Sequence, residues 1–281
     1  MKKTALLLAL VAIMIPSTLS AKKDVEDKIK VMSFNVRNGD SEDGTNRWDL
    51  RYAHTAIMID DNKPDVIGMQ EALDYQLNYY QDIVKPYKFV GKGREDGKKK
   101  GEYTGILYNS KTTSVTKWGM FWISETPDQP SAGWDASVNR TATWALMKDK
   151  RNGRQYYVVN THYDEVGVLS RINGTSLILS KIAEINKEKL PVVLCGCFNV
   201  RQDDASLAEL ESTMENCRKK ADKTDDGVTY NAWGRVAQQS QIDHIYYSGF
   251  SRCEEFSVLT KKVEDRTFIS DHFPLVAVMV F

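Results

Sequence analysis

Four apolar stretches that each run directly into polar side chains constrain the fold of this chain most. The first is Pro191–Arg201 (PVVLCGCFNVR), in which Val-Val-Leu follows a proline and Asn199 comes shortly after. A short apolar run of this kind is typical of a buried strand. The same form recurs at Val31–Asn38 (VMSFNVRN), Val158–Glu165 (VVNTHYDE) and Ile269–Val276 (ISDHFPLV). Since α/β sheets place their chemistry at strand ends, we expect the four polar ends to form one site.

The order of helix and strand patterns predicts an α+β fold. Strands at 30–37 and 65–71 alternate with helices at 48–59 and 73–84, and a long helix at 168–187 leads into the strand after Pro191. Further strands are predicted at 87–90, 104–108, 114–124, 140–148, 155–164, 241–248, 255–260 and 274–281, with a short helix at 206–212. Because many strands follow one another directly, we predict two mostly antiparallel sheets packed face to face with helices outside, each half of the chain giving one sheet.

The first 21 residues have the pattern of a signal peptide. Lys2 and Lys3 precede an apolar run from Ala5 to Ile15, and small residues follow at positions 18 and 20. The run is too short to span a bilayer, so we expect no stable membrane anchor, although an uncleaved N-terminal anchor is the alternative. Residues 22–281 show no break in composition and are predicted to form one domain, exported to the periplasm or the extracellular space.

Charge argues against a sequence-independent nucleic-acid binder. The chain has 38 basic and 38 acidic side chains, whereas such binders need a basic surface. Its one dense basic cluster, Lys92–Lys100, contains two acids and is either a solvated loop or a contact for an anionic substrate. Trp118, Trp122 and Trp134 either stack on a substrate at a loop rim or belong to the core.

The polar residues at the strand ends suit hydrolysis of a phosphate ester. Glu71 and Asp271 offer hard oxygen ligands, as Mg²⁺ or Ca²⁺ prefers. His162 and His272 can carry protons or stabilise an oxyanion, and Asp243 can orient a histidine. Each residue also has a structural explanation. The carboxylate of Glu71 can interact favourably with the dipole of the helix that follows it, and Asn35 and Asn199 can form hydrogen bonds with the backbone of turns. The joint occurrence of these residues at strand ends favours a metal-assisted site.

The four cysteines leave their redox state open. Cys195 and Cys197 are two residues apart, so they share a face of a strand and cannot pair with each other without strain. Either can pair with Cys217 or Cys253 in an oxidising compartment. The spacing of cysteines and histidines along the chain matches no zinc motif.

The motifs of this chain, taken in order, resemble those of the endonuclease/exonuclease/phosphatase family. They are SFNVRN, GMQE, GILYN, NRTATWA, NTHYDE, GCFN, IDHIYYS and SDHFPL, and the resemblance covers roughly residues 29–281. Further motifs, NRWDLR, GKGREDGKKKGEY and FWISETPD, are similar to those of its exported bacterial metal-dependent hydrolases. The resemblance implies a four-layer αββα sandwich and cleavage of a phosphoester with Mg²⁺, or with Mn²⁺ or Ca²⁺ in its place.

The resemblance also implies roles for individual residues. Asn35, Glu71 and Asp271 would form the metal site. His162 and His272 would contact the scissile phosphate, Asp243 would orient His272, and Asn199 would help to place the attacking water. Tyr108 and Arg171 match positions that line or brace the substrate site. The acidic residues among the loops favour a small phosphorylated substrate, such as a sugar, a polyol, a lipid headgroup or a nucleotide, and we expect a monomer.

One position departs from the family pattern. Where the family has Gly-Asp-Phe-Asn, with the aspartate as base for the attacking water, this chain has Cys197. A neutral thiol is a poor base, and losing a general base costs a factor of about 10² to 10⁴. A thiolate could act as one if the histidines and a metal lowered its pKa. The chain is therefore expected to be a phosphoesterase that Cys197 weakens, or else a phosphoester-binding protein. Covalent catalysis by Cys197 is disfavoured because no phosphate-cradling loop follows it.

Overall fold

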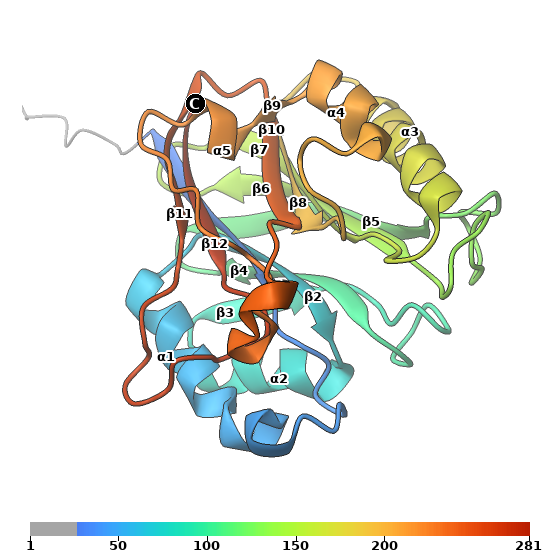
Figure 1. Cartoon of the computed structure of the whole chain (residues 1–281). Coiled ribbons are helices and arrows are strands. Elements are labelled where there is room, and N and C mark those ends of the chain that lie inside the picture. Colours follow the sequence, from blue (N-terminus) through green and yellow to red (C-terminus); the bar gives the residue numbers. More distant parts are fainter. Residues whose placement is uncertain (1–26) are drawn as a thin grey trace, which may run out of the picture.

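The structure is a computed structural model that describes residues 27–281, and the predicted signal peptide, residues 1–21, lies outside the described residues (Figure 1). Two six-stranded sheets pack face to face. In order across the first sheet, the strands are β11 (Arg252–Val258), β12 (Leu275–Val280), β1 (Lys28–Asn35), β2 (Val66–Ala72), β4 (Tyr103–Asn109) and β3 (Tyr87–Val90). In the second they are β5 (Thr113–Trp122), β6 (Thr141–Asp149), β7 (Gln155–His162), β8 (Val192–Cys197), β10 (Asp243–Ser248) and β9 (Glu215–Asn216).

Helices cover the outer face of each sheet, as Figure 1 shows. Helices α1 (Tyr52–Asn62) and α2 (Asp74–Ile83) pack on the first sheet through a buried cluster that includes Ile59, Leu77 and Tyr80. Helices α3 (Val168–Ile185) and α4 (Ala208–Thr213) cover the second sheet. A third apolar cluster fills the space between the sheets, next to the short helix α5 (Cys217–Lys220). The predicted four-layer αββα sandwich is thereby confirmed.

One part of the fold prediction was wrong, namely that each half of the chain gives one sheet. The last two long strands, β11 and β12, return to the first sheet, where β12 pairs antiparallel with β1 from Lys28 to Ser33. This pairing satisfies the backbone groups of β1 on the side that β2 leaves free. It also places the segment just before β12 at the same end of the sheet as the end of β1.

The strand directions bring the predicted polar ends together. β1 and β2 run parallel, as do β7 and β8. Residues at or just after the carboxyl ends of all four strands, namely Arg37, Glu71, His162 and Asn199, line one cavity, so these ends lie together in the two packed sheets. β10 is antiparallel to β8 and β12 is antiparallel to β1, so these two strands begin where the others end. Six strands therefore deliver side chains to one edge, as the sequence predicts.

A buried amide links the two sheets directly beneath this edge. Asn160 of β7 is fully buried and donates its Nδ2 hydrogens to the carbonyl oxygens of Met69 (2.8 Å) and Gly105 (2.9 Å) in the opposite sheet. Its Oδ1 accepts a hydrogen bond of 2.7 Å from Nε2 of Gln70. Buried polar groups that are fully hydrogen-bonded rigidify a core, so this contact fixes how the two sheets sit on each other.

Among the described residues, no helix combines the length and the apolar character needed to cross a bilayer.

We predict that Asn160→Ala lowers the free energy of unfolding by about 2 to 4 kcal/mol, because it removes three buried hydrogen bonds between the sheets and opens a cavity. Urea unfolding followed by circular dichroism measures the change. A matched control is Asn78→Ala, which removes an amide bonded only within its own helix and should change stability by less than about 0.5 kcal/mol. Equal losses in the two variants would contradict the proposed link between the sheets.

Candidate active site

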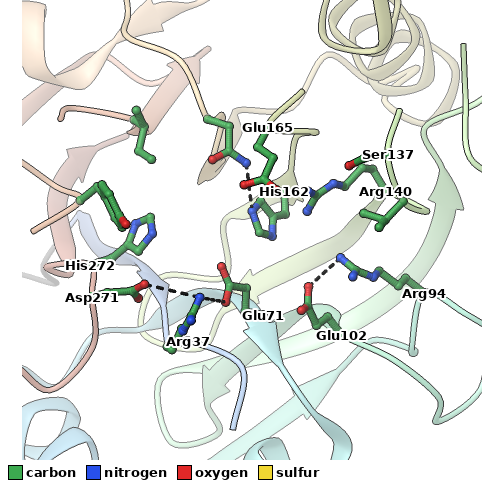
Figure 2. A pocket seen from close by; sticks show the side chains of 14 residues that line it. Arg37, Glu71, Arg94, Glu102, Ser137, Arg140, His162, Glu165, Asp271 and His272 are labelled. Carbon is green, nitrogen blue, oxygen red and sulfur yellow. Dashed lines mark hydrogen bonds and ion pairs between the residues drawn. The ribbon is translucent and has the colours of Figure 1, made fainter. Parts of the chain in front are cut away.

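A polar cavity of about 370 Å³ opens at the edge where the six strand ends meet (Figure 2). Five of the predicted site residues line it, namely Glu71, His162, Asn199, Asp271 and His272. The others that line it are Arg37, Arg94, Glu102, Ser137, Val138, Arg140, Glu165, Tyr230 and Ile242. The sequence therefore identified some of the residues that line the cavity, and the structure adds the others.

Glu71 is held in an unusual backbone conformation at the end of β2. Its φ of +61° lies in the left-handed region, at an irregularity in the pairing of β2 with β4. Such conformations are costly for residues other than glycine and are often found at functional sites. Its Oε1 accepts a hydrogen bond of 2.8 Å from Nδ2 of Asn35, and its Oε2 accepts one of 3.1 Å from the backbone N–H of Asn38. The carboxylate is thus fixed at the cavity, and Asn35 orients it.

Asp271, which is buried, and Glu71, whose side chain is 13% exposed, form a pair of carboxylates around one cation. Nη1 of Arg37 lies 3.9 Å from Oε2 of Glu71 and 3.6 Å from Oδ2 of Asp271 (Figure 2). Burial raises the pKa of Asp271, and the charge of Glu71 raises it further. The two carboxylates are hard donors that fit a divalent ion such as Mg²⁺. Asn35 supports Glu71 through Nδ2, while its Oδ1 accepts a hydrogen bond of 3.0 Å from the backbone N–H of Arg37. The residues present therefore fit the metal that the family resemblance implies.

His272 is a buried cation paired with Asp243. Its Nδ1 donates a hydrogen bond of 2.8 Å to Oδ2 of Asp243, and both side chains are nearly inaccessible to solvent. Burial alone would lower the pKa of His272, but Asp243 and then the other nearby carboxylates outweigh it and raise the pKa to about 9. A charged imidazole lining the cavity can donate a hydrogen bond to an anionic substrate.

His162 differs from His272 in its charge. Burial and the nearby Arg140 lower its pKa well below the usual value, so the ring is neutral at pH 7. Its Nε2 lies 3.3 Å from Nδ2 of Asn199, which also donates a hydrogen bond of 2.8 Å to the carbonyl oxygen of Tyr163. Burial also acts against ionisation of Glu71, yet its pKa is lowered to about 2 by the neighbouring histidines and Asn35. With His162 neutral, His272 is the histidine that carries this effect at pH 7.

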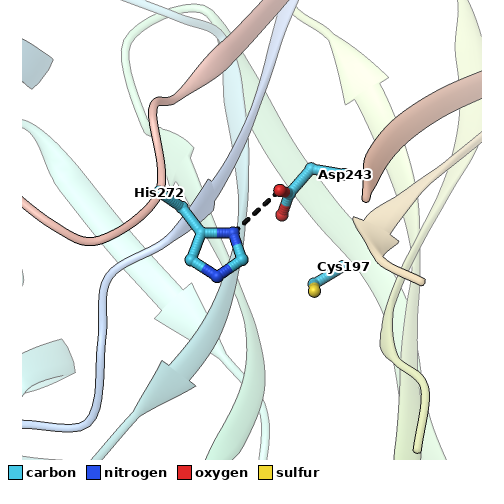
Figure 3. A group of neighbouring side chains, drawn as sticks. All are labelled: Cys197, Asp243 and His272. Carbon is cyan, nitrogen blue, oxygen red and sulfur yellow. Dashed lines mark hydrogen bonds and ion pairs between the residues drawn. The ribbon is translucent and has the colours of Figure 1, made fainter. Parts of the chain in front are cut away.

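Cys197 lies behind the cavity wall, beside the Asp243–His272 pair (Figure 3). It ends β8 opposite Asp243 and is fully buried. Burial raises the pKa of its thiol well above the usual value, and the charge of Asp243 adds to this. The backbone N–H of Asn199 and the charge of Arg140 act in the opposite direction but do not outweigh these effects, so Cys197 is a neutral thiol at pH 7 rather than a thiolate base. A Cβ on the preceding Gly196 would collide with the carbonyl oxygen of Thr161, which explains the glycine there.

Two predicted substrate-site residues lie elsewhere. Tyr108 pairs with Val66 at the start of β2, the end of that strand remote from Glu71, so the prediction that it lines the site was wrong. Arg171 does not line the cavity either. Its Nη1 donates to the carbonyl oxygen of Asp164 (3.0 Å), so it braces the loop that follows His162.

The sequence did not identify the arginines of the cavity, although each lies in a recognised motif. Arg37 belongs to SFNVRN, Arg94 to the basic loop and Arg140 to NRTATWA. Nη1 of Arg94 donates a hydrogen bond of 2.6 Å to Oε2 of Glu102, so only part of the basic loop reaches the cavity. Trp122 is buried and donates from Nε1 to the carbonyl oxygen of Arg94 (2.7 Å), so it supports the loop rather than a substrate.

The comparisons with known proteins agree with this geometry. Residues 32–272 match the model of the Endonuclease/Exonuclease/phosphatase family, and the chain belongs to that family. A family member from Bacteroides vulgatus is 32% identical, with 90% of this chain and 98% of that chain covered and a TM-score of 0.85. A mannosyl-6-phosphatase of Bacteroides thetaiotaomicron is also 32% identical, with 90% and 100% covered and a TM-score of 0.84. An uncharacterised protein of Acanthamoeba polyphaga mimivirus is 24% identical, with 89% and 99% covered.

We predict that Asp243→Asn lowers the pKa of His272 from about 9, because Asp243 is the strongest of the groups that oppose burial and only the smaller effects of Asp271 and Glu71 remain. NMR titration of the four histidines, in protein freed of divalent ions with EDTA, measures this. Since the folded pKa exceeds the unfolded value, the ionic pair stabilises the protein fully below pH 6.5 and is lost as pH rises through about 9. Asp243→Asn should therefore destabilise the protein at pH 7 and have less effect at pH 10. An unchanged His272 titration in the variant would contradict the assignment.

Proposed function

We propose that this protein is a divalent-metal-dependent phosphoesterase that acts on a small phosphorylated molecule in an exported compartment. The observation that carries the proposal is the convergence of Glu71 and Asp271 with the cationic His272 in one enclosed cavity. A phosphoester needs charge neutralisation and positioning more than covalent chemistry, and this arrangement provides both. The pattern of residues 1–21 supports export.

The residues of the cavity suggest a division of roles. Glu71 and Asp271, with Asn35, would hold a divalent ion, which would supply charge neutralisation for the phosphate oxygens. His272, charged through Asp243, would donate a hydrogen bond to a phosphate oxygen. Asn199 is fixed by the carbonyl oxygen of Tyr163 and would orient the phosphate or the attacking water beside His162. The protein has a side chain for each of these roles and lacks only a strong base.

The charges around the cavity favour a compact substrate over a polyanion. Three arginines line it, but each is paired with a carboxylate: Arg37 with Asp43, Arg94 with Glu102 and Arg140 with Asp164. Little net positive charge is left to bind a nucleic-acid backbone. A volume of about 370 Å³ suits a phosphorylated sugar, and the similar Bacteroides mannosyl-6-phosphatase supports a hexose phosphate.

A second candidate function is binding of a phosphoester without turnover. The neutral, buried thiol of Cys197 favours it, because no carboxylate stands where the family has its base. Every other proposed role remains filled, so ligand binding would be retained. The two candidates differ in the rate of hydrolysis alone.

We predict that Cys197→Asp raises the rate of hydrolysis of mannose 6-phosphate with Mg²⁺ or Mn²⁺ by about 10² or more, because a carboxylate can accept the proton of the attacking water. The rate is measured as released phosphate, with a reductant present. Cys253→Ser is the matched control, because it replaces another buried thiol whose hydrogen bond to the carbonyl oxygen of Glu255 a hydroxyl can keep. An active wild type that Cys197→Asp does not improve would show that the thiol is no defect.

We predict that Glu71→Gln abolishes phosphate release from the wild-type and Cys197→Asp proteins, because it removes a charged metal ligand without changing the size of the side chain. EDTA should have the same effect, reversed by excess Mg²⁺. Plasmid DNA incubated with either protein should remain supercoiled. Nicking of the plasmid that disappears in Glu71→Gln would contradict the small-molecule substrate, and activity that survives EDTA would contradict the metal requirement.

A further inference from the structure

Cys197, Asp243 and His272 come from three distant parts of the chain and lie close together (Figure 3), and His272 also lines the cavity. One ligand atom of each, a sulfur, a carboxylate oxygen and a ring nitrogen, lies within 4.8 Å of the other two. All three side chains are buried. The spacing of cysteines and histidines along the sequence gives no sign of this group, because only the fold brings positions 197, 243 and 272 together.

Asp243 adds an independent observation. Its Oδ2 accepts the hydrogen bond from His272, but its Oδ1 is buried and has no hydrogen-bond partner in the part of the chain that the structure describes. A buried carboxylate oxygen without a partner is costly, so a missing ligand or proton is expected there. The nearest soft atom is the sulfur of Cys197, which lies opposite Asp243 in the pairing of β8 with β10.

We propose that Cys197, Asp243 and His272 form a binding site for Zn²⁺, separate from the hard-ion site at Glu71 and Asp271. Sulfur, nitrogen and a single carboxylate are ligands that suit tetrahedral Zn²⁺, whereas Mg²⁺ requires an octahedron of oxygens. Bond lengths of roughly 2.0 to 2.3 Å separate the ligand atoms of such a site by roughly 3.3 to 3.8 Å. No two of the three ligand atoms are more than 4.8 Å apart, and the hydrogen-bonded nitrogen and oxygen are 2.8 Å apart, so small side-chain movements reach that geometry.

Binding at this site is an exchange of two protons for a metal ion. The S–H bond of Cys197 and one ring N–H bond of the charged His272 break as the S–Zn and N–Zn bonds form, both protons go to the solvent, and water molecules leave the hydration shell of the ion. The thiolate and the carboxylate together carry two negative charges, which neutralise Zn²⁺. His272 lines the cavity, so the ion reaches the group from the cavity past this ring, and a cavity water can fill the fourth position.

Occupation of this site has a consequence for the reaction. A metal bound to His272 removes the charged imidazole that we propose to contact the phosphate, so Zn²⁺ inhibits hydrolysis even when Mg²⁺ is saturating. This consequence depends on the proposed function, whereas binding of the metal does not. The same thiol that weakens the protein as a hydrolase thus makes it sensitive to thiophilic metal ions.

Cobalt provides a direct test of binding, because a Co²⁺–thiolate bond gives a charge-transfer absorption in the near ultraviolet. Purified protein, kept reduced with a phosphine, should develop this band with one equivalent of Co²⁺ and lose it when Zn²⁺ is added. Cys197→Ser should abolish the band and weaken Zn²⁺ binding by about tenfold or more in a chelator competition. Cys197→Asp, which restores the residue of the family, should lack the band and remain folded by circular dichroism.

Matched controls separate this site from the other thiols. Cys195→Ser and Cys217→Ser each remove a buried thiol of the core and should leave the band unchanged. Binding at the exposed group of His54, Glu264 and Asp265 would give no thiolate band, since it contains no sulfur. A wild type without the band, or a band that survives Cys197→Ser, would overturn the proposal.

Measuring Zn²⁺ inhibition of hydrolysis together with the Co²⁺ band separates a failure of the Zn²⁺ site from a failure of the proposed phosphoesterase activity. If the wild type hydrolyses no phosphoester but shows the Cys197-dependent band, the Zn²⁺ site stands and the proposed activity falls. If the wild type is active, Zn²⁺ should reduce its rate at least about tenfold more strongly than that of Cys197→Asp, and EDTA followed by Mg²⁺ should restore it. Equal inhibition of both proteins would contradict a role for the thiol.

Discussion

The hydrogen bonds of Asn160 are the contact on which the geometry of the site depends. The metal donors stand on the first sheet, whereas His162, Asn199 and the strand of Asp243 belong to the second. A displacement of one sheet against the other would separate these groups, and apolar packing alone is not directional. The three hydrogen bonds that Asn160 makes join β7 to β2 and β4. Asn160 comes just before His162 in β7, so these bonds lie close to the cavity. Because all the groups are buried, any shift of the sheets would leave polar atoms without partners.

The electrostatics of the cavity follow from this fixed arrangement. Asp243 and Asp271 are buried acids and Glu71 is largely shielded from solvent, and the three cannot all be charged without cations close by. The protein supplies Arg37 and a charged His272 for this purpose. A divalent ion between Glu71 and Asp271 would relieve the remaining repulsion. The carboxylates of the site therefore bind positive charge, and these cations would in turn attract the anionic substrate.

Many of the strands and several residues of the site could be predicted from the sequence, because the patterns that mark them are local. An apolar run followed by a polar residue marks a strand end, so Glu71, His162 and Asn199 could be found without a structure. The return of β11 and β12 to the first sheet could not, because strand pairing depends on which edge is free and leaves no local pattern. Tyr108 shows the same limit, since only the register of β4 against β2 determines which end of the sheet it occupies. The arginines were missed because each lies in a loop, where position depends on tertiary contacts.

Cys197 changes the chemistry of the site more than its structure. An aspartate at this position would face Asp243 across β8 and β10, so two buried carboxylates would share the cation of His272. The thiol removes one of these charges and keeps the packing, since a buried cysteine behaves as a small apolar residue. The same exchange takes away the base and places a sulfur beside Asp243, where a soft metal can bind. Loss of the base for hydrolysis and gain of a ligand for Zn²⁺ would thus have a single cause, the replacement of two hard carboxylate oxygens by one soft sulfur atom.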